Sequence, residues 1–177
     1  KIMKYATIKK CDVANGPGVR VSLYVSGCNH HCKGCFNPET WDFNYGKEFT
    51  QDTINTLLNA MDKEYIDGIT ILGGEPLDPI NQKEVANLIS QVKQRYPNKS
   101  IWCFTGFDFE KEVMEKMYKK FDTTKQIIDN LDVLVDGEFK EDKKNLSLRF
   151  RGSENQRIID VKKTLNSDHI IWKELED

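Results

Sequence analysis

The sequence predicts an α/β fold, in which short parallel strands alternate with helices to form a partial, open (β/α) barrel. Four short apolar segments predict strands, and three amphipathic segments between or after them predict helices. The chain has 177 residues, whereas a closed eight-stranded barrel typically needs about 250. We therefore expect a single domain over residues 1–177, with a core at about 15–156 and a C-terminal extension at about 157–177.

The four predicted strands are short, apolar and rich in branched or aromatic residues, as strands buried on both faces are. They are Val21–Val25, Ile69–Leu72, Ile101–Phe104 and Val133–Val135. Two further segments, Leu146–Arg149 and Ile170–Trp172, are candidates for strands that would extend the sheet.

Helices are predicted where apolar residues recur three and four positions apart. The first covers residues 54–61 and has Thr50 as its N-cap. The second carries its apolar stripe over residues 85–92, and we expect it to begin at Asn81 and to stop before Pro97. The third follows Asp108.

Polar and glycine-containing motifs follow each of the four predicted strands. Because the carboxyl ends of parallel strands meet at one edge of a sheet or barrel, these motifs should converge there. The sequence therefore predicts the functional site at this edge. The motifs, in chain order, are Cys28, Gly73-Gly74-Glu75-Pro76, Thr105-Gly106 and Asp136-Gly137.

Three cysteines, Cys28, Cys32 and Cys35, are spaced Cys-x3-Cys-x2-Cys, and clustered thiolates usually bind a soft metal or a cluster. Structural zinc and fully protein-ligated clusters need four ligands, so three leave one position open. Zinc remains an alternative if His30 or His31 supplies a fourth ligand. Adjacent histidines must point in opposite directions, however, so we favour an iron–sulfur cluster and expect both side chains to be solvent-exposed.

Composition excludes some other classes of function. The net charge is −2, which gives no reason to expect a nucleic-acid partner or an anionic membrane. No apolar run approaches the roughly 20 residues of a membrane span. The odd number of cysteines, five, argues against a disulfide framework, and we assign no metal role to Cys11 or Cys103. We expect a cytoplasmic protein with reduced or metal-bound cysteines.

The region from Asn15 to Gln156 resembles the radical S-adenosylmethionine (SAM) enzymes, and within them the activating proteins of glycyl-radical enzymes. The motifs that carry this resemblance are Asn15-Gly-Pro-Gly-Val-Arg20, Ser26-Gly-Cys28, Cys35-Phe-Asn37, Thr40-Trp41 and Gly73-Gly-Glu-Pro-Leu77. A second set is similar to the activating subunits of anaerobic ribonucleoside-triphosphate reductase: Ile101-Trp102, Thr105-Gly106, Val133-Leu-Val-Asp-Gly137, Arg151-Gly-Ser153 and Asn155-Gln156.

One position departs from the wider superfamily. Many radical SAM loops carry an aromatic residue directly before the third cysteine, where this chain has Gly34. The activating-subunit branch is similar to this chain in having glycine there and an aromatic residue directly after the cysteine, here Phe36. The departure therefore favours the narrower resemblance.

The resemblance implies a 4Fe-4S cluster held by Cys28, Cys32 and Cys35, with SAM bound to the fourth iron. It also implies that reductive cleavage of SAM gives methionine and a 5′-deoxyadenosyl radical, which takes hydrogen from a glycine Cα of the partner. The residues expected around SAM are Gly34, Cys35, Phe36, Gly73, Gly74, Glu75, Thr105 and Asp136.

Several of these positions also have a simpler interpretation as turns. Gly73 and Gly74 let backbone approach a ligand, and Glu75 offers an acceptor for the methionyl amine, yet the same motif is ordinary turn chemistry. Thr105 and Asp136 could likewise end their strands without touching SAM. Arg20 has no assigned role at this point.

The partners implied by the resemblance are the large subunit of an anaerobic ribonucleoside-triphosphate reductase and an electron donor such as flavodoxin. The chain could also form a homodimer. Positive charge gathers between Lys140 and Lys163, whereas the segment from Asn166 onward is acidic, and we expect Arg149, Arg151 and Arg157 to help dock the reductase. Two other functions stay open: activation of another glycyl-radical enzyme of the formate-lyase type, and a structural zinc-binding interaction module.

Overall fold

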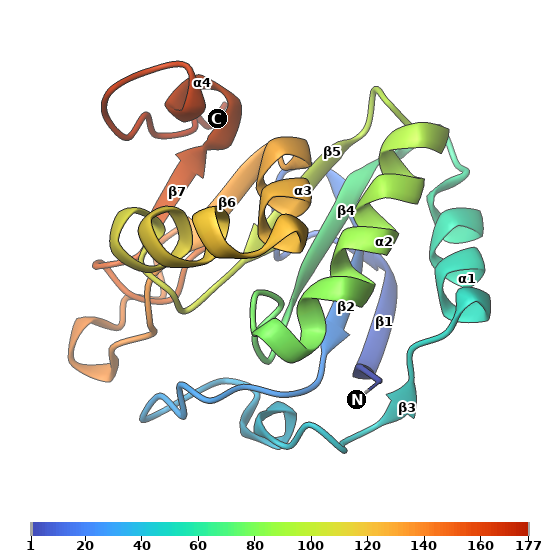
Figure 1. Cartoon of the computed structure of the whole chain (residues 1–177), viewed down its shortest axis with the longest axis horizontal. Helices are drawn as coiled ribbons and strands as arrows, with labels where there is room; N and C mark the ends of the chain where they lie inside the picture. Colours follow the sequence, from blue (N-terminus) through green and yellow to red (C-terminus); the bar gives the residue numbers. More distant parts are fainter. Residues whose placement is uncertain (1, 177) are drawn as a thin grey trace.

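The computed structural model describes residues 2–176, which form one open, seven-stranded mixed sheet with helices (Figure 1). The order across the sheet is β3-β1-β2-β4-β5-β6-β7, so β3 and β7 are its two edges. The predicted α/β class is confirmed. The strands are β1 (Lys4–Asp12), β2 (Val19–Val25), β3 (Lys47–Glu48), β4 (Ile66–Gly73), β5 (Ser100–Phe104), β6 (Val133–Asp136) and β7 (Arg157–Asp160).

The four strands predicted from apolar runs are β2, β4, β5 and β6, and each pairs in parallel with the next. Three further strands, β1, β3 and β7, flank them and pair in antiparallel fashion. Strand β1 was not predicted because its sequence is rich in lysine and most of it is exposed or half-buried. Strand β7 brings part of the expected C-terminal extension into the sheet.

Neither candidate for an additional strand is correct. Residues 146–149 form turns and bends beside an exposed Leu146, and so make no ladder. In the segment Ile170–Trp172, only Trp172 pairs with the sheet, through an isolated bridge to Ile159. The first segment pairs with no strand, and the second lies beside β7 only around Trp172, where the amide of Asp160 donates to the carbonyl of Ile171 and the amide of Lys173 donates to that of Ile158.

The helices lie close to their predicted positions. The first is α1, which begins after Thr50, and the side chain of Thr53 completes a capping box with this residue. The second, α2, begins at Pro79 and not at Asn81, because the Asp78 carboxylate caps the Ile80 amide. The bounds are α1 (Gln51–Met61), α2 (Pro79–Arg95), the π-type helix η2 (Phe109–Tyr118), α3 (Asp122–Asn130) and α4 (Val161–Leu165), with short 3-10 turns η1 (Pro38–Trp41) and η3 (Glu141–Lys143).

Helices cover one face of the sheet, here called the outer face, as Figure 1 shows for α1, α2 and α3. Alternate strand residues such as Leu23, Ile71 and Cys103 point to this face and pack with the apolar sides of the helices in the main core. Cys103 is fully buried in this core and packs there as a small apolar residue. No helix among residues 2–176 is long and apolar enough to cross a membrane.

The opposite, inner face of the sheet is filled near the amino ends of its strands by Arg20. Its guanidinium donates to the hydroxyl oxygens of Thr70 and Ser100 at 2.9 Å each, and to three backbone carbonyls. The group also lies 5.7 Å from the ring centre of Trp102. Burial lowers the pKa of Arg20 to about 10. The Arg20 guanidinium therefore has a structural role inside the sheet.

Candidate functional site

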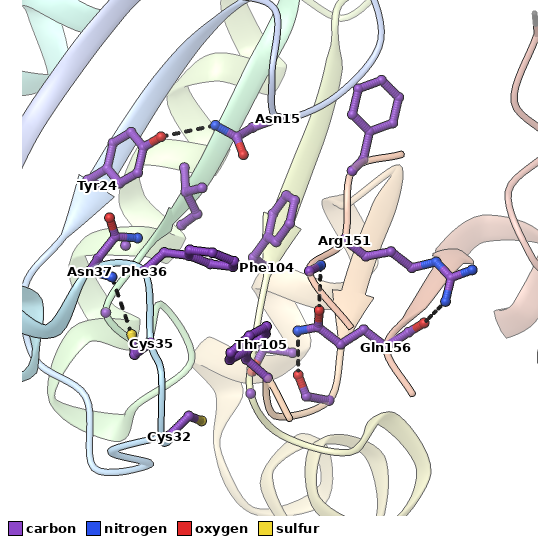
Figure 2. Close-up of a pocket in the computed structure, with 18 of the residues that line it drawn as sticks. Asn15, Tyr24, Cys32, Cys35, Phe36, Asn37, Phe104, Thr105, Arg151 and Gln156 are labelled. Carbon is purple, nitrogen blue, oxygen red and sulfur yellow. Dashed lines mark hydrogen bonds between the residues drawn. The ribbon is translucent and has the colours of Figure 1, made fainter. Parts of the chain in front are cut away.

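A cavity of about 570 Å³ opens on the inner face of the sheet, toward the carboxyl ends of its parallel strands. Its floor is formed by side chains that stand side by side on three strands: Tyr24, Leu72 and Phe104. Figure 2 shows Cys32 and Cys35 at one end of this cavity and Asn15 and Tyr24 at the other. The cavity is thus elongated along the strands.

All three clustered cysteines line this cavity. The loop that carries them, residues 27–37 and here called the cysteine loop, is fixed at its start by hydrogen bonds from the amides of Gly27 and Cys28 to the carbonyls of Thr40 and Trp41. Within the loop the amide of Cys35 donates to the carbonyl of Cys32 at 3.1 Å. All five cysteines of the chain are free thiols in the structure.

The distances between the three cysteine sulfurs bear on whether they would hold a single metal ion or a cluster. In the described residues 2–176, only Asp108, Glu110 and Asp136 form a trio of potential ligands whose atoms all lie within 4.8 Å of one another. At least one pair of the three cysteine sulfurs is therefore more than 4.8 Å apart. Sulfurs on one tetrahedral zinc would be about 3.8 Å apart, given a Zn–S bond of about 2.3 Å.

The environment of the thiols disfavours their charged form in the absence of a metal. Burial raises the pKa of Cys28 to about 11, and the negative charge of Glu75 acts in the same direction. Burial also raises the pKa of Cys32, with a contribution from the charge of Glu138. A cationic metal group next to these sulfurs would reverse the balance, because metal ligation deprotonates thiols.

The Gly-Gly-Glu-Pro turn after β4 lies against the cysteine loop. The amide of Glu75 donates to the carbonyl of Gly27 at 2.7 Å, and the amide of Gly74 donates to Val25. Gly73 has a φ of +111°, and a Cβ there would lie 2.6 Å from the backbone of Val25. Gly73 and Gly74 both line the cavity, so backbone at this turn faces the space beside the cysteines.

The carboxylate of Glu75 is 1% exposed and already has protein partners. It accepts hydrogen bonds from the Thr105 hydroxyl at 2.9 Å and from the backbone amides of Gly106 and Leu77 at 2.7 and 2.8 Å. Its Oε1 also lies 2.7 Å from Nε2 of His30. The surface that this turn presents to the cavity is therefore made by its glycines.

His30 differs from the exposed side chain that we expected. Its side chain is only 11% exposed, because its ring packs on Phe107 with centroids 4.5 Å apart and touches Glu75 and Glu138. The expectation failed because residues that follow β4, β5 and β6 contact the ring. His31 is exposed, as predicted, and stacks on Trp41 at 4.5 Å.

Both ring nitrogens of His30 face carboxylate oxygens, at 2.7 Å for Glu75 and 3.1 Å for Glu138. Only the imidazolium form has two N–H donors for two such acceptors. Burial alone would lower the pKa of His30, but the hydrogen bonds and charges of the two glutamates raise it to about 9. A positive charge thus lies within the cysteine loop at neutral pH.

The remaining predicted site residues fall into two groups. Thr105 and Phe36 line the cavity, and Phe36, which is 57% exposed, packs against Phe139 at its rim. Asp136 and Gly34 are not among the lining residues. The Asp136 carboxylate is buried and accepts hydrogen bonds from Arg157 and from the amide of Phe109. Gly34, with a φ of +75°, lies beside the Glu141 side chain.

Two anchors of the site were missed in the sequence. The fully buried Asn81 donates from its amide to the carbonyls of Ser26 and Glu75, at 3.1 and 3.0 Å, and so joins the cysteine loop to the turn. Asn29 donates to Asp78 at 3.0 Å. The Asp78-Pro79 pair, a capping residue before a proline, was the available signal that Asn81 lies inside α2.

Residues 137–156, which connect β6 to β7, form one wall of the cavity. Gln156 fixes this segment by accepting from the amides of Gly152 and Ser153 and donating to the carbonyl of Gly137. The stretch from Lys143 to Arg151 contains four cations and no acidic residue. An exposed Leu146 stands among them at the rim.

The three arginines expected to dock a partner differ in availability. Arg149 is exposed and, among residues 2–176, donates to the carbonyl of Glu176 and lies over the ring of Phe150. Arg151 lines the cavity and donates to the carbonyls of Glu154 and Gln156. Arg157, in contrast, forms ion pairs with the acidic trio Asp108, Glu110 and Asp136 and offsets part of their charge.

Comparison with known proteins extends this description. Residues 14–159 match the family model of the 4Fe-4S single cluster domain. The chain is 43% identical over 158 residues to the anaerobic ribonucleoside-triphosphate reductase-activating protein of Enterobacteria phage T4, covering 88% of this chain and 93% of that protein. It is 38% identical to the protein of the same name from Escherichia coli K12, and 36% identical to that of Vibrio cholerae, in each case over 88% of this chain and 97% of the relative.

Proposed function

Since the chain belongs to the family of anaerobic ribonucleoside-triphosphate reductase-activating proteins, we propose that it activates such a reductase by generating a glycyl radical in it. The proposed reaction is the one-electron reduction of SAM to methionine and a 5′-deoxyadenosyl radical. This radical then takes a hydrogen atom from a glycine Cα of the reductase, which leaves 5′-deoxyadenosine and the glycyl radical. An electron donor such as flavodoxin supplies the electron.

The observation that carries the proposal is the convergence of three thiols on one cavity. Cys28, Cys32 and Cys35 would hold a 4Fe-4S cluster, which supplies an open iron for SAM and the electron for its cleavage. Three thiolates are one fewer than the four ligands of a structural zinc site, and both ring nitrogens of His30 already face carboxylates. This disfavours a structural zinc module.

The other cavity residues have roles in this proposal that follow from their positions. Backbone at Gly73 and Gly74 would contact the methionyl part of SAM, since both glycines face the space beside the cysteines. Phe36, Phe104 and Leu72 offer apolar surface for the adenosine. We keep Thr105 in the SAM site, because it lines the cavity. We keep Glu75 and Asp136 as predicted contacts whose carboxylates have protein partners in this structure.

The open sheet fits a protein substrate. The sheet does not close on itself, with β3 and β7 as its two ends, so its inner face can be reached from the side, and we propose that it represents the partial barrel of the radical SAM type. The partner's glycine would enter along the wall formed by residues 137–156. Arg149 and Arg151 remain candidates for docking the reductase, whereas Arg157 is engaged within the fold. Such a reaction belongs in the cytoplasm.

The decisive experiment is anaerobic reconstitution followed by incubation with SAM, a reductant and the large subunit of an anaerobic ribonucleoside-triphosphate reductase. We expect about four irons per chain, SAM cleavage on reduction, and a glycyl doublet in the electron paramagnetic resonance spectrum. A colourless protein with one tightly bound zinc would contradict the proposal. A glycyl signal only with a formate-lyase type of partner would reassign the substrate.

A charge reversal tests the docking surface separately. In Arg149→Glu, an exposed cation beside the cavity becomes an anion, so docking should weaken while the SAM site stays intact. We expect glycyl-radical formation to slow by about tenfold with SAM cleavage unchanged. Arg95→Glu, on the far end of α2, is the matched control and should leave both rates unchanged. Parallel loss of both activities in Arg149→Glu would indicate a folding defect instead of a docking surface.

A further inference from the structure

His30 makes contacts that no other side chain of the cysteine loop makes. Its ring reaches Glu75 after β4, Phe107 after β5 and Glu138 after β6. The ring also covers Gly106, where a Cβ would lie 2.6 Å from its atoms. A single side chain between two metal-ligand positions therefore touches the ends of three parallel strands.

The ring of His30 is held from both sides, because each of its nitrogens faces a carboxylate oxygen at hydrogen-bond distance. The bond to Glu75 is 2.7 Å long and almost fully buried, whereas Glu138 is half-exposed. Glu75 is itself held by Thr105, Gly106 and Leu77. The Glu75 carboxylate is therefore held in a fixed position, where it forms a hydrogen bond with the His30 ring.

We propose that His30 is a positioning residue that clamps the cysteine loop onto the strand ends and so fixes the distance between the cluster site and the Gly73-Gly74 turn. The inference deepens the proposed function, because SAM must contact the open iron and this turn at the same time. Without the clamp, the loop would keep its three thiols but would sample a wider range of positions relative to the turn.

The chain contains a matched control at the next position. His31 lies in the same loop and carries the same ring, but it stacks on Trp41 and touches no strand end. Its φ is +50°, a left-handed conformation that asparagine also tolerates. His31→Asn therefore changes the loop composition without removing a contact to the strand ends.

The first measurement does not depend on the cluster. Lys33, in the middle of the cysteine loop, has a side chain that is 91% exposed, so trypsin cleavage after it reports how often the loop opens. In His30→Gln, a glutamine amide cannot bridge the two glutamates. We expect cleavage at Lys33 to be about tenfold faster than in wild type, with the same melting temperature. His31→Asn should change this rate less than twofold.

The second measurement uses the anaerobically reconstituted full chain. His30→Gln should bind as much iron as wild type, since all three cysteines remain, but its affinity for SAM should fall by about tenfold. The change that SAM causes in the spectrum of the reduced cluster should weaken accordingly. Glu138→Gln, at a half-exposed position with no risk to folding, should show a smaller shift in the same direction.

The two readouts separate the clamp from the function on which it rests. Wild-type cleavage at Lys33 together with wild-type SAM affinity in His30→Gln would overturn the clamp, as would equal effects of His30→Gln and His31→Asn. If the wild-type protein itself fails to bind SAM, the proposed function is wrong, while the cleavage rates at Lys33 still test whether His30 holds the loop.

Discussion

The inner face of the sheet has two halves, which differ in the partners of their buried charged side chains. Near the amino ends of the strands, Arg20 fills the space, and all of its partners are neutral oxygens of strands and turns. Near the carboxyl ends, the face is hollow, and the buried Glu75 pairs with His30 from the loop that carries the cysteines. The first half is a packed interior, and the second is a cavity bordered by loops.

The difference shows how a buried charge can be interpreted. The Arg20 guanidinium is satisfied by groups whose positions the sheet already fixes, so it contributes to stability and has no open side for a ligand. The Glu75 carboxylate, in contrast, is bonded partly to His30, a side chain of the separate cysteine loop. The burial of Glu75 therefore helps to fix the position of that loop. We therefore expect substitutions in the filled half to change stability, and substitutions in the hollow half to change function.

The largest expected effect is the loss of the cluster from the hollow half. In Cys32→Ser the hydroxyl is a poor ligand for iron, so we expect iron to fall to background after anaerobic reconstitution, with no SAM cleavage. Cys32 is half-exposed, so the free energy of unfolding of the metal-free protein should change by less than about 1 kcal/mol. Iron quantitation and urea unfolding measure the two quantities.

Cys11→Ser is the matched control, because Cys11 is an exposed thiol on β1 that does not line the cavity. It should keep the iron content of wild type. Iron retained in Cys32→Ser, or lost in Cys11→Ser, would show that the ligand set is wrong.

In the filled half of the sheet, Arg20→Met should lower stability and leave iron binding unchanged, which is the opposite of the result expected for Cys32→Ser. Removal of the guanidinium leaves the oxygens of Thr70 and Ser100 without a donor in a buried space. We expect the free energy of unfolding to fall by about 3 kcal/mol, while the iron bound per folded chain stays at the wild-type value. Arg95→Met, at an exposed position on α2, should cost no more than about 0.5 kcal/mol. An unchanged urea midpoint in Arg20→Met would remove the distinction between the two halves.

The two halves also differ in how far the sequence predicts them. The strands β2, β4, β5 and β6 were predictable, because their apolar runs follow directly from burial on both faces. So was the gathering of Cys28, Gly74 and Thr105 around one cavity, because parallel strands end at one edge. Strand β1 was not predictable, because its lysines obscure any strand pattern in the sequence. Only its pairing with β2 explains why it forms a strand.

Contacts between side chains from distant segments were the least predictable part. Arg20 and Ser100 are 80 residues apart, and His30 and Glu138 are 108 apart, so no local pattern connects them. A histidine between predicted metal ligands looks the same in sequence whether its side chain is exposed or buried against distant carboxylates. The position of the Asn81 amide between two carbonyls depends on where α2 begins, and a shift of two residues in that start hides it.

A smaller effect is expected at the glycine turn of the hollow half. In Gly73→Ala, the new Cβ would meet the backbone of Val25 at 2.6 Å in a conformation with φ of +111°. We expect a loss of about 2 kcal/mol in the free energy of unfolding, together with weaker SAM binding. Gly137→Ala isolates the conformational part, since φ there is +96° but the nearest atom is 3.7 Å away, and it should cost about 1 kcal/mol. Equal losses in the two variants would show that close approach at Gly73 is unimportant.

The smallest effect is expected at Asp12, which lies between the two halves. Its buried carboxylate accepts from Ser22 at 2.6 Å and from the side chain of Asn15 at 2.7 Å, and Asn15 also donates to Tyr24 at the far end of the cavity. Burial raises the pKa of Asp12, but the hydrogen bonds from Ser22, Ala14 and Asn15 outweigh it, so the pKa lies below its ordinary value of 3.8.

Because the folded pKa is lowered, the stabilisation by Asp12 is fully present above pH 3.8 and is lost as the pH falls through the lower, folded value. Asp12→Asn should therefore lower the free energy of unfolding by about 1 kcal/mol at pH 6, and the difference from wild type should shrink as the pH falls below 3.8. Urea unfolding of both proteins across this range measures it. A difference that stays constant with pH would mean that the ionised form of the Asp12 carboxylate adds nothing to stability. In that case the hydrogen bond from Asn15 to Asp12 would not link the filled half of the sheet to the cavity.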